Sequence, residues 1–271
     1  MSIEKTIIAI PARLESTRLP NKILADINGK PMIQRVLEQC SKAKISSKIV
    51  ICTDSKEVGF LVNKLGYDFI NTKKSCASGS ERIASALDSI LKIAWGNNDS
   101  LNSSFEANIE DKLSKTGIIN VQGDQPLLDP KVITIMDQFI KTKSENIEVV
   151  TPIHKINKED IHNPAVVKTL VSNKGQALYF SRSAIPHIRD IDKGEWHKYY
   201  NYWGHVGIYG YRGDILNKWN KYRSSDLEKL EKLEQLRLIE AGIKISTFEV
   251  EGNFISVDTM EQLNIVRRKI T

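Results

Sequence analysis

The chain of 271 residues is long enough to bury a sizeable core, and a composition of 41% hydrophobic and 27% charged residues argues against wholesale disorder. Its net charge of +6 is dispersed among 33 acidic residues, which argues against a nucleic-acid-binding protein and gives weak support to a small anionic substrate. Three cysteines without metal-ligand spacing argue against a disulfide framework and a cysteine-based metal site.

The first half of the chain alternates short apolar runs with helical patterns. The opening MSIEKTIIAI lacks the apolar core of a signal peptide, and no run approaches the roughly 20 apolar residues of a membrane span, so we expect a cytoplasmic protein without membrane contact. Strands are predicted over 6–10 and 48–53, and helices over 31–43, 55–65 and 80–93. This alternation indicates βαβ units, a mostly parallel sheet and the α/β class.

The pattern changes along the second half. Residues 96–116 are rich in Asn, Ser and charge, which predicts a surface excursion with a short helix near 109–113. GIINVQGDQPLL then resumes the sheet, and from about 148 to 211 extended segments follow one another with fewer helices. DLEKLEKLEQLRLIEAG predicts one helix that ends near Gly242, with Leu230, Leu233, Leu236 and Leu238 on its buried face. A strand and a helix from about 259 close the chain.

The loop IPARLESTRLPNK follows the first predicted strand and carries Arg13, Arg18 and Lys22. Ligands of open α/β sheets bind outside the carboxyl ends of the strands, and converging cations and hydroxyls suit a phosphate chain. The loop lacks the spacing of a P-loop, and read alone it is more typical of a solvated turn.

Two further motifs occur at expected strand or helix ends. SGSER predicts a helix start, where free N–H groups favour an anion or the polar edge of a base, although capping alone explains the motif. NVQGDQP places Asp124 just past a strand, and ISVDT places Asp258 in the same position. Two such oxygen ligands are what Mg²⁺ needs when phosphate oxygens and waters complete its shell. Asp258 has the alternative of capping the last helix.

The second half offers polar residues with a different character. Arg182 ends an apolar strand, where a guanidinium is costly to bury unless it meets a carboxylate or phosphate, so a substrate acid is expected. His205 alone is more typical of a structural histidine. Glu234 and Gln235 are equally compatible with a plain helix surface.

Eight segments occur in an order that resembles the pattern of 3-deoxy-manno-octulosonate cytidylyltransferases, also called CMP-KDO synthetases. They are IPARLESTRLPNK, NGKPMIQRV, SGSER, NVQGDQP, ALYFSR, GHVGIYGYR, LEKLEQLR and VDTMEQL. The resemblance implies a nucleotide-diphospho-sugar transferase fold, with a Rossmann-like mixed sheet and a substrate and dimerisation lobe in a single domain, 1–271. The nucleotide-binding core would comprise about 1–147 and 212–271, and the lobe about 148–211.

The resemblance also implies an activity and its residues. The enzyme would be a Mg²⁺-dependent homodimer that activates the sugar acid KDO with CTP and releases pyrophosphate, on the route to lipopolysaccharide. Arg13, Arg18 and Lys22 would engage the triphosphate, and Arg13, Lys22, Asp124 and Asp258 would carry the catalysis. The implied nucleotide neighbours are Pro11, Ala12, Ser80, Arg82 and Gln122; the Mg²⁺ ligands are Asp124 and Asp258; the sugar-acid contacts are Arg182, His205, Tyr209, Glu234 and Gln235.

The chain departs from the family pattern at a few positions. QGDQP replaces QGDEP, and together with DLEKLEKLEQLR it is similar to variants that activate an amino-substituted octulosonate, so both sugar acids stay open. A nine-carbon sialic-type acid is a further alternative within the enzyme class. Outside that class stand a non-catalytic sugar-nucleotide sensor, which should lack paired metal carboxylates, and a nucleic-acid binder, which should show a basic stripe.

Overall fold

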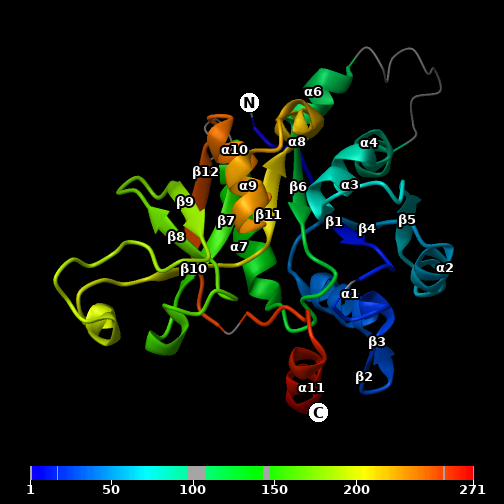
Figure 1. Cartoon of the computed structure of the whole chain (residues 1–271). Coiled ribbons are helices and arrows are strands. Elements are labelled where there is room, and N and C mark those ends of the chain that lie inside the picture. Colours follow the sequence, from blue (N-terminus) through cyan, green and yellow to red (C-terminus); the bar gives the residue numbers. More distant parts are fainter. Residues whose placement is uncertain (1, 17, 97–107, 143–146, 253, 271) are drawn as a thin grey trace. The chain divides into compact units, whose positions relative to one another are not determined.

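A computed structural model describes residues 2–16, 18–96, 108–142, 147–252 and 254–270 (Figure 1). The chain forms two compact units. The first comprises Met1–Asn146, Gly210–Asn220 and Asn253–Thr271, and the second comprises Ile147–Tyr209 and Lys221–Gly252. In the described part of the chain no helix is both long and apolar enough to cross a membrane. Cys40, Cys52 and Cys76 are buried and free, so no disulfide forms.

The strands of the first unit follow the order β5–β4–β1–β6–β11. Their bounds are β1 (Lys5–Ala12), β4 (Lys48–Thr53), β5 (Asp68–Asn71), β6 (Thr116–Asn120) and β11 (Tyr209–Arg212). β1 pairs in parallel with both β4 and β6, and β4 pairs in parallel with β5. The chain moves outward from β1 to β5 and returns on the other side of β1, which creates a topological switch point. The loops after β1 and β6 meet there, at the carboxyl ends of the strands.

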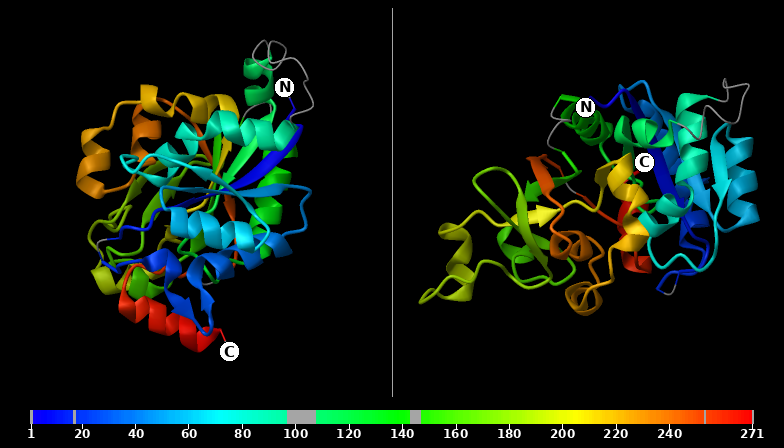
Figure 2. Two further views of the ribbon diagram at one scale, coloured as in Figure 1. Left: turned by 90° about the vertical axis from the view of Figure 1, so that its right-hand side faces the viewer. Right: turned by 90° about the horizontal axis from the view of Figure 1, so that it is seen from above.

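Helices of the first unit lie on both sides of these strands (Figures 1 and 2). They are α1 (Met32–Lys42), α2 (Lys56–Lys64), α3 (Gly79–Ser85), α4 (Leu87–Trp95), α6 (Ile109–Ser114), α7 (Pro130–Thr142), α8 (Gly213–Asn217) and α11 (Met260–Lys269). In α1 the apolar residues at helical spacing are buried, namely Met32, Ile33, Val36, Leu37 and Cys40. The helix expected over 80–93 is instead two helices joined at Ala86, and α6 confirms the short helix within 96–116. The rest of that excursion lies mainly outside the described residues.

Shorter elements connect the main strands and helices of the first unit. They are η1 (Lys22–Leu24), β2 (Asp26–Ile27), β3 (Lys30–Pro31) and η5 (Trp219–Lys221). Asn21, immediately before η1, adopts the left-handed region with φ of 53°, which Asn tolerates better than most residues. This turn ends the loop after β1 and starts η1 at Lys22.

The strands of the second unit follow the order β12–β7–β10–β8–β9. Their bounds are β7 (Val149–Lys155), β8 (Lys168–Val171), β9 (Ala177–Ser181), β10 (Trp203–His205) and β12 (Ile245–Glu249). β10 is antiparallel to β7 and β8, β8 is antiparallel to β9, and β12 is parallel to β7. Between residues 149 and 205 the only helices in the described structure are the short 3-10 helices η3 (Lys158–Asp160) and η4 (Lys193–Lys198). The predicted α/β class with a mixed strand arrangement is confirmed.

Residues 221–252 differ from the expected division of the chain. The sequence grouped them with the nucleotide half, but their contacts assign them to the second unit, because β12 pairs with β7. The predicted leucine helix is also wrong in detail: it is two helices, α9 (Asp226–Glu231) and α10 (Leu236–Glu240), separated by Lys232 in the left-handed conformation. Leu230, expected on the buried face, is 80% exposed, because the break at Lys232 interrupts the helical stripe.

Candidate active site

A pocket of about 360 Å³ lies at the carboxyl ends of β1 and β6 in the first unit. Its walls come from the loop after β1, the start of α3, the turn after β6 and the residues before α11. Of the residues predicted from the sequence, the pocket is lined by Pro11, Arg13, Arg18, Lys22, Arg82, Gln122, Asp124 and Asp258. The cation-rich loop therefore borders a cavity and is not merely a solvated turn.

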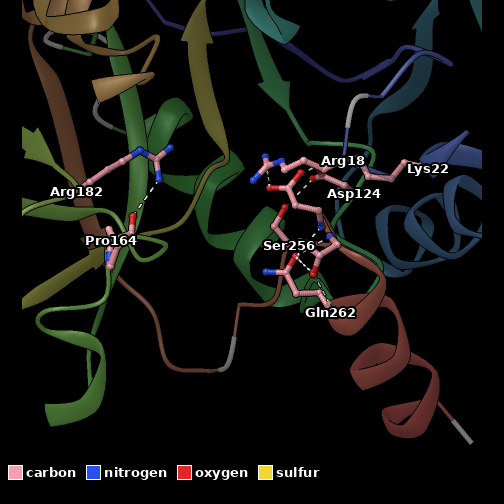
Figure 3. Close-up of polar contacts among 9 residues, drawn as sticks. Arg18, Lys22, Asp124, Pro164, Arg182, Ser256 and Gln262 are labelled. Atoms are coloured by element: carbon pink, nitrogen blue, oxygen red, sulfur yellow. Dashed lines mark hydrogen bonds and ion pairs between the residues drawn. The ribbon is translucent and has the colours of Figure 1, made fainter. Parts of the chain in front are cut away.

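Three charges meet at one end of this pocket. The Nζ atom of Lys22 lies 2.5 Å from Oδ2 of Asp124 (Figure 3). It also lies 2.9 Å from Oδ1 of Asp258. Burial alone would lower the pKa of Lys22, but the carboxylates of Asp124 and Asp258 outweigh it and raise the pKa. For Asp258, burial opposes ionisation, and Lys22 and Arg18 overcome it and lower the pKa. Two carboxylate groups therefore converge on one cation.

The surrounding backbone fixes both carboxylates. Thr259 caps α11 and forms a capping box with Gln262, so the Asp258 side chain is not the cap and is left to bind Lys22 and Arg18. The Gln262 Oε1 atom also accepts the backbone N–H of Asp258 at 2.7 Å. Asp124 is held from the same segment, because the Ser256 hydroxyl donates to its Oδ1 atom at 3.0 Å. The convergence of two such oxygens on a cation fits the donor set that Mg²⁺ prefers.

The start of α3 forms another wall of the pocket. Ser78 caps the helix, and a Cβ atom at Gly79 would lie 3.0 Å from Pro11 Cγ and 3.2 Å from Gln122 Oε1, so glycine permits this close approach. Arg82 lines the pocket, but its guanidinium is buried and donates to Asp54 and Thr72. Arg82 is therefore placed to stabilise this wall of the pocket.

Two predicted nucleotide neighbours lie behind the pocket lining. Ser80 is fully buried, and its hydroxyl lies 3.0 Å from the Tyr211 hydroxyl and accepts from Asn120 at 3.2 Å. Asn120 also accepts from Gln122, so a buried polar chain supports the Gln122 amide. Ala12 is buried at the end of β1 and is not among the lining residues.

In the second unit, Arg182 directly follows β9. Its Nε atom donates to the Glu231 carbonyl at 2.8 Å and its Nη1 atom to the Pro164 carbonyl at 3.0 Å, the contact drawn in Figure 3. Among the residues that the structure describes, no carboxylate forms an ion pair with this guanidinium. The carbonyl groups fix the orientation of the guanidinium but carry no full negative charge. The guanidinium is therefore suited to bind the carboxylate of a substrate.

His205 lies on β10 beside Tyr209, with 5.3 Å between the ring centroids. Its Nε2 atom lies 2.9 Å from the Thr151 hydroxyl, which also contacts the Ile208 carbonyl at 2.8 Å. A carbonyl only accepts, so the single Thr151 hydrogen is directed to it, and His205 Nε2 is the donor to Thr151. Burial lowers the pKa of His205 to about 3, so the ring is neutral and its Nδ1 atom is an acceptor.

Glu234 and Gln235 immediately precede α10, which contacts β9. Gln235 is only 3% exposed, and its Nε2 atom has no hydrogen-bond partner in the described structure. Glu234 is half-buried. Their environment is therefore not the plain helix surface that the sequence left open. The second unit thus holds all five predicted sugar-acid contacts.

Several supporting residues were not singled out in the sequence. The sequence could have pointed to Lys168, because a lysine inside the apolar strand AVVKTLV requires buried hydrogen-bond or charge partners. Glu231, Ser256, Asp54 and Thr151 carried no such signal, since each acts through a contact distant in sequence.

Comparison with known proteins gives consistent results. A profile of the cytidylyltransferase family matches residues 7–95 and 96–245. A 3-deoxy-manno-octulosonate cytidylyltransferase from Francisella tularensis subsp. novicida is 40% identical over 263 residues, 96% of each chain. One from Chloroherpeton thalassium is 37% identical over 193 residues, which are 69% of this chain and 68% of the relative. A solved CMP:2-keto-3-deoxy-manno-octonic acid synthetase complexed with CTP is similar with a TM-score of 0.82 and 34% identity over 98% of both chains. This likeness confirms the predicted nucleotide-sugar transferase fold.

Proposed function

We propose, from the premise that the chain belongs to the 3-deoxy-manno-octulosonate cytidylyltransferase family, that it transfers the cytidylyl group of CTP to KDO. The products are CMP-KDO and pyrophosphate, the reaction depends on Mg²⁺, and it serves lipopolysaccharide synthesis. The observation that carries the proposal is the convergence of Asp124 and Asp258 on Lys22 at the edge of a pocket.

The proposed reaction needs charge stabilisation more than a covalent nucleophile. The anomeric hydroxyl oxygen of the sugar acid attacks the α-phosphorus, a new O–P bond forms, the P–O bond to pyrophosphate breaks, and the hydroxyl proton is released to water. Negative charge grows on the phosphate oxygens and the leaving group. Arg13, Arg18 and Lys22 line the pocket from one loop and bind the triphosphate in this proposal.

Asp124 and Asp258 are the residues that would hold Mg²⁺. The metal supplies Lewis-acid stabilisation of the phosphate charge. Two protein carboxylates suffice when phosphate oxygens and waters complete the shell, and no described cluster of three or more His, Cys, Asp or Glu side chains offers a larger set. Phosphate groups also give Lys22 and Arg18 alternative partners to Asp258.

The sugar acid is recognised by residues of the second unit in this proposal. Arg182 binds the carboxylate, because its guanidinium is oriented by carbonyls and has no described acidic partner. Neutral His205 accepts a hydrogen bond from a sugar hydroxyl at Nδ1, and Tyr209, Glu234 and Gln235 supply further polar contacts. Recognition by one cation and several hydrogen-bonding groups suits a polyhydroxylated monocarboxylate.

The test is pyrophosphate release from CTP and Mg²⁺ with three acids in parallel: KDO, 8-amino-3,8-dideoxy-manno-octulosonate and a sialic acid. We expect KDO to give the highest kcat/KM. A higher value with the amino sugar would support the alternative motivated by QGDQP, and a higher value with the sialic acid would support the nine-carbon alternative. Absence of pyrophosphate with all three, together with tight CTP binding, would contradict the enzyme and favour a sugar-nucleotide sensor.

The proposal also includes a homodimer and a cytoplasmic location, both expectations from the sequence, and no nucleic-acid partner. Light scattering coupled to size-exclusion chromatography measures the mass directly. A dimer has twice the 30.7 kDa of the chain. A monomeric mass at concentrations where the enzyme is fully active would remove the homodimer from the proposal.

A further inference from the structure

Lys168 occupies an unusual position for a lysine. It lies on β8 between Ser181 of β9 and Gly204 of β10, and its residue is 0% exposed. Its Nζ atom donates three hydrogen bonds, to the carbonyl oxygens of Asn163 at 2.7 Å, Val166 at 2.6 Å and Arg182 at 2.6 Å. Three ammonium hydrogens thus meet three backbone acceptors.

These partners distinguish Lys168 from a lysine in a stabilising ion pair. A buried charge is costly unless it is paired or fully hydrogen-bonded, and in the described structure no carboxylate lies within ion-pair distance of Lys168. Its hydrogen bonds connect the loop 163–166 with Arg182, the residue that follows β9. No strand pairing joins that loop to Arg182 in the described structure. The ammonium is therefore placed to set their relative position.

Both of those segments determine where the Arg182 guanidinium lies. The Pro164 carbonyl, within the loop 163–166, accepts from Arg182 Nη1. The main chain of Arg182 is fixed at its N–H by the Glu231 carboxylate at 2.9 Å and at its carbonyl by Lys168. Glu231 also accepts from the Ser181 hydroxyl. Lys168 thus holds the backbone of Arg182 and the loop that orients its head group.

We propose that Lys168 is a positioning residue of the sugar-acid site, which aligns the Arg182 guanidinium for the substrate carboxylate without touching the substrate. This inference rests on the proposed function, because it takes Arg182 as the carboxylate contact. Loss of the ammonium frees the loop 163–166 and the Arg182 carbonyl together. Sugar-acid affinity then falls, while CTP, bound through residues of the first unit, keeps its affinity.

The proton of Lys168 gives the proposal a second readout. Burial and, to a smaller extent, the nearby Arg182 charge lower the pKa of Lys168 to about 8, against the opposite effect of Glu231 and Asp160. A neutral amine has two hydrogens for three carbonyls, so one hydrogen bond is lost as the pH rises through this range. The KM for the sugar acid should rise above pH 8.

The experiment compares Lys168→Met with Lys174→Met in the full chain. Lys174 lies in the turn between β8 and β9 and is exposed, so its variant is a matched control for loss of a lysine. We expect Lys168→Met to raise the KM for the sugar acid about tenfold, the effect of one misplaced charge-assisted hydrogen bond, with the KM for CTP within about twofold of wild type. Its sugar-acid KM should be insensitive to pH between 7 and about 9.

The outcomes separate this inference from the proposed function. A wild-type protein that releases no pyrophosphate contradicts the proposed function, whatever Lys168 does. An active wild type with an unchanged sugar-acid KM in Lys168→Met, or with equal rises in both KM values, overturns the positioning role. If Lys168→Met does not fold, the wild-type pH series decides: a sugar-acid KM that stays constant above pH 8 overturns the inference, and a selective rise supports it.

Discussion

At the candidate sites, the cations of the two units have different kinds of partner. In the first unit Lys22 and Arg18 bind the carboxylates of Asp124 and Asp258, so charge is balanced within the protein. In the second unit the Arg182 guanidinium and the Lys168 ammonium donate only to carbonyl oxygens in the contacts that the structure describes, and His205 is neutral. A balanced cluster can exchange partners with a metal and phosphates, whereas an unbalanced cation attracts an acid. The contrast supports the proposal that the first unit binds the nucleotide and the second unit binds the sugar acid.

The largest expected effect comes from the balanced cluster. Asp124→Asn keeps the size of the side chain but removes a charge that the proposed Mg²⁺ site needs, so kcat should fall by about a thousandfold or more. Asp88→Asn, at an exposed position in the first turn of α4, is the control and should keep full activity. Pyrophosphate release and circular dichroism measure turnover and folding. A folded Asp124→Asn protein with near-normal kcat would remove Asp124 from the metal role.

In the second unit, loss of the Arg182 charge should weaken binding of the sugar acid selectively. Arg182→Ala removes the charge expected to meet the substrate carboxylate, and the sugar-acid KM should rise about a hundredfold while the KM for CTP changes little. Arg189→Ala, which removes a guanidinium that is 90% exposed in the same unit, serves as the control. Steady-state kinetics with each substrate varied in turn makes the measurement. A selective loss of CTP affinity in Arg182→Ala would reverse the assignment of the two halves.

Because His205 is neutral in the folded protein, the free energy of unfolding should depend on pH. The folded-state pKa of His205 is lowered by burial to about 3, below its ordinary value of 6.5. The contribution of His205 to the free energy of unfolding is complete above pH 6.5 and decreases as the pH falls toward 3. In that range only the unfolded chain binds the proton. The slope is about 1.4 kcal/mol per pH unit. Urea unfolding of wild type and His205→Gln between pH 6 and 4 checks this. Identical slopes would show that His205 takes up its proton without unfolding.

The smallest expected effect concerns the orientation of Asp124. Ser256→Ala removes the hydroxyl that donates to Asp124 Oδ1 but leaves the backbone hydrogen bond from Val257 to the Asp124 carbonyl. We expect kcat to fall about fivefold and the Mg²⁺ concentration for half-maximal activity to rise. Ser256→Thr keeps a hydroxyl and should recover most of the activity. If Ser256→Ala and wild type respond equally to Mg²⁺, the hydroxyl does not orient the metal ligand.

The sequence predicted the elements of the first unit well because their physical signals are local. The run KIVICT is β4, and the stripe from Met32 to Cys40 is the buried face of α1. The breaks at Ala86 and Lys232 were not predicted, since the apolar spacing continues across both. At the second break, Glu231 ends α9 while its carboxylate and carbonyl bind Ser181 and Arg182. A contact between positions about 50 residues apart in the chain leaves no periodic trace.

The candidate site was predictable in its residue types and less so in its contacts. Motif order and strand ends placed Lys22, Asp124 and Asp258 in one group, and the structure brings them together. Sequence alone left open whether Asp258 binds a metal or caps the last helix, and the Thr259 capping box excludes the capping role. Arg82 was expected at the nucleotide, but its buried partner Asp54 lies 28 positions away, so its ion pair was not visible in the motif.

One measurement tests the central claim most directly: phosphorus NMR of the purified protein with CTP, KDO and Mg²⁺. The account predicts one CMP sugar ester for each pyrophosphate formed, and no product when a chelator removes the metal. Pyrophosphate that appears with CMP but without the sugar ester, or CTP that remains unchanged, would contradict it.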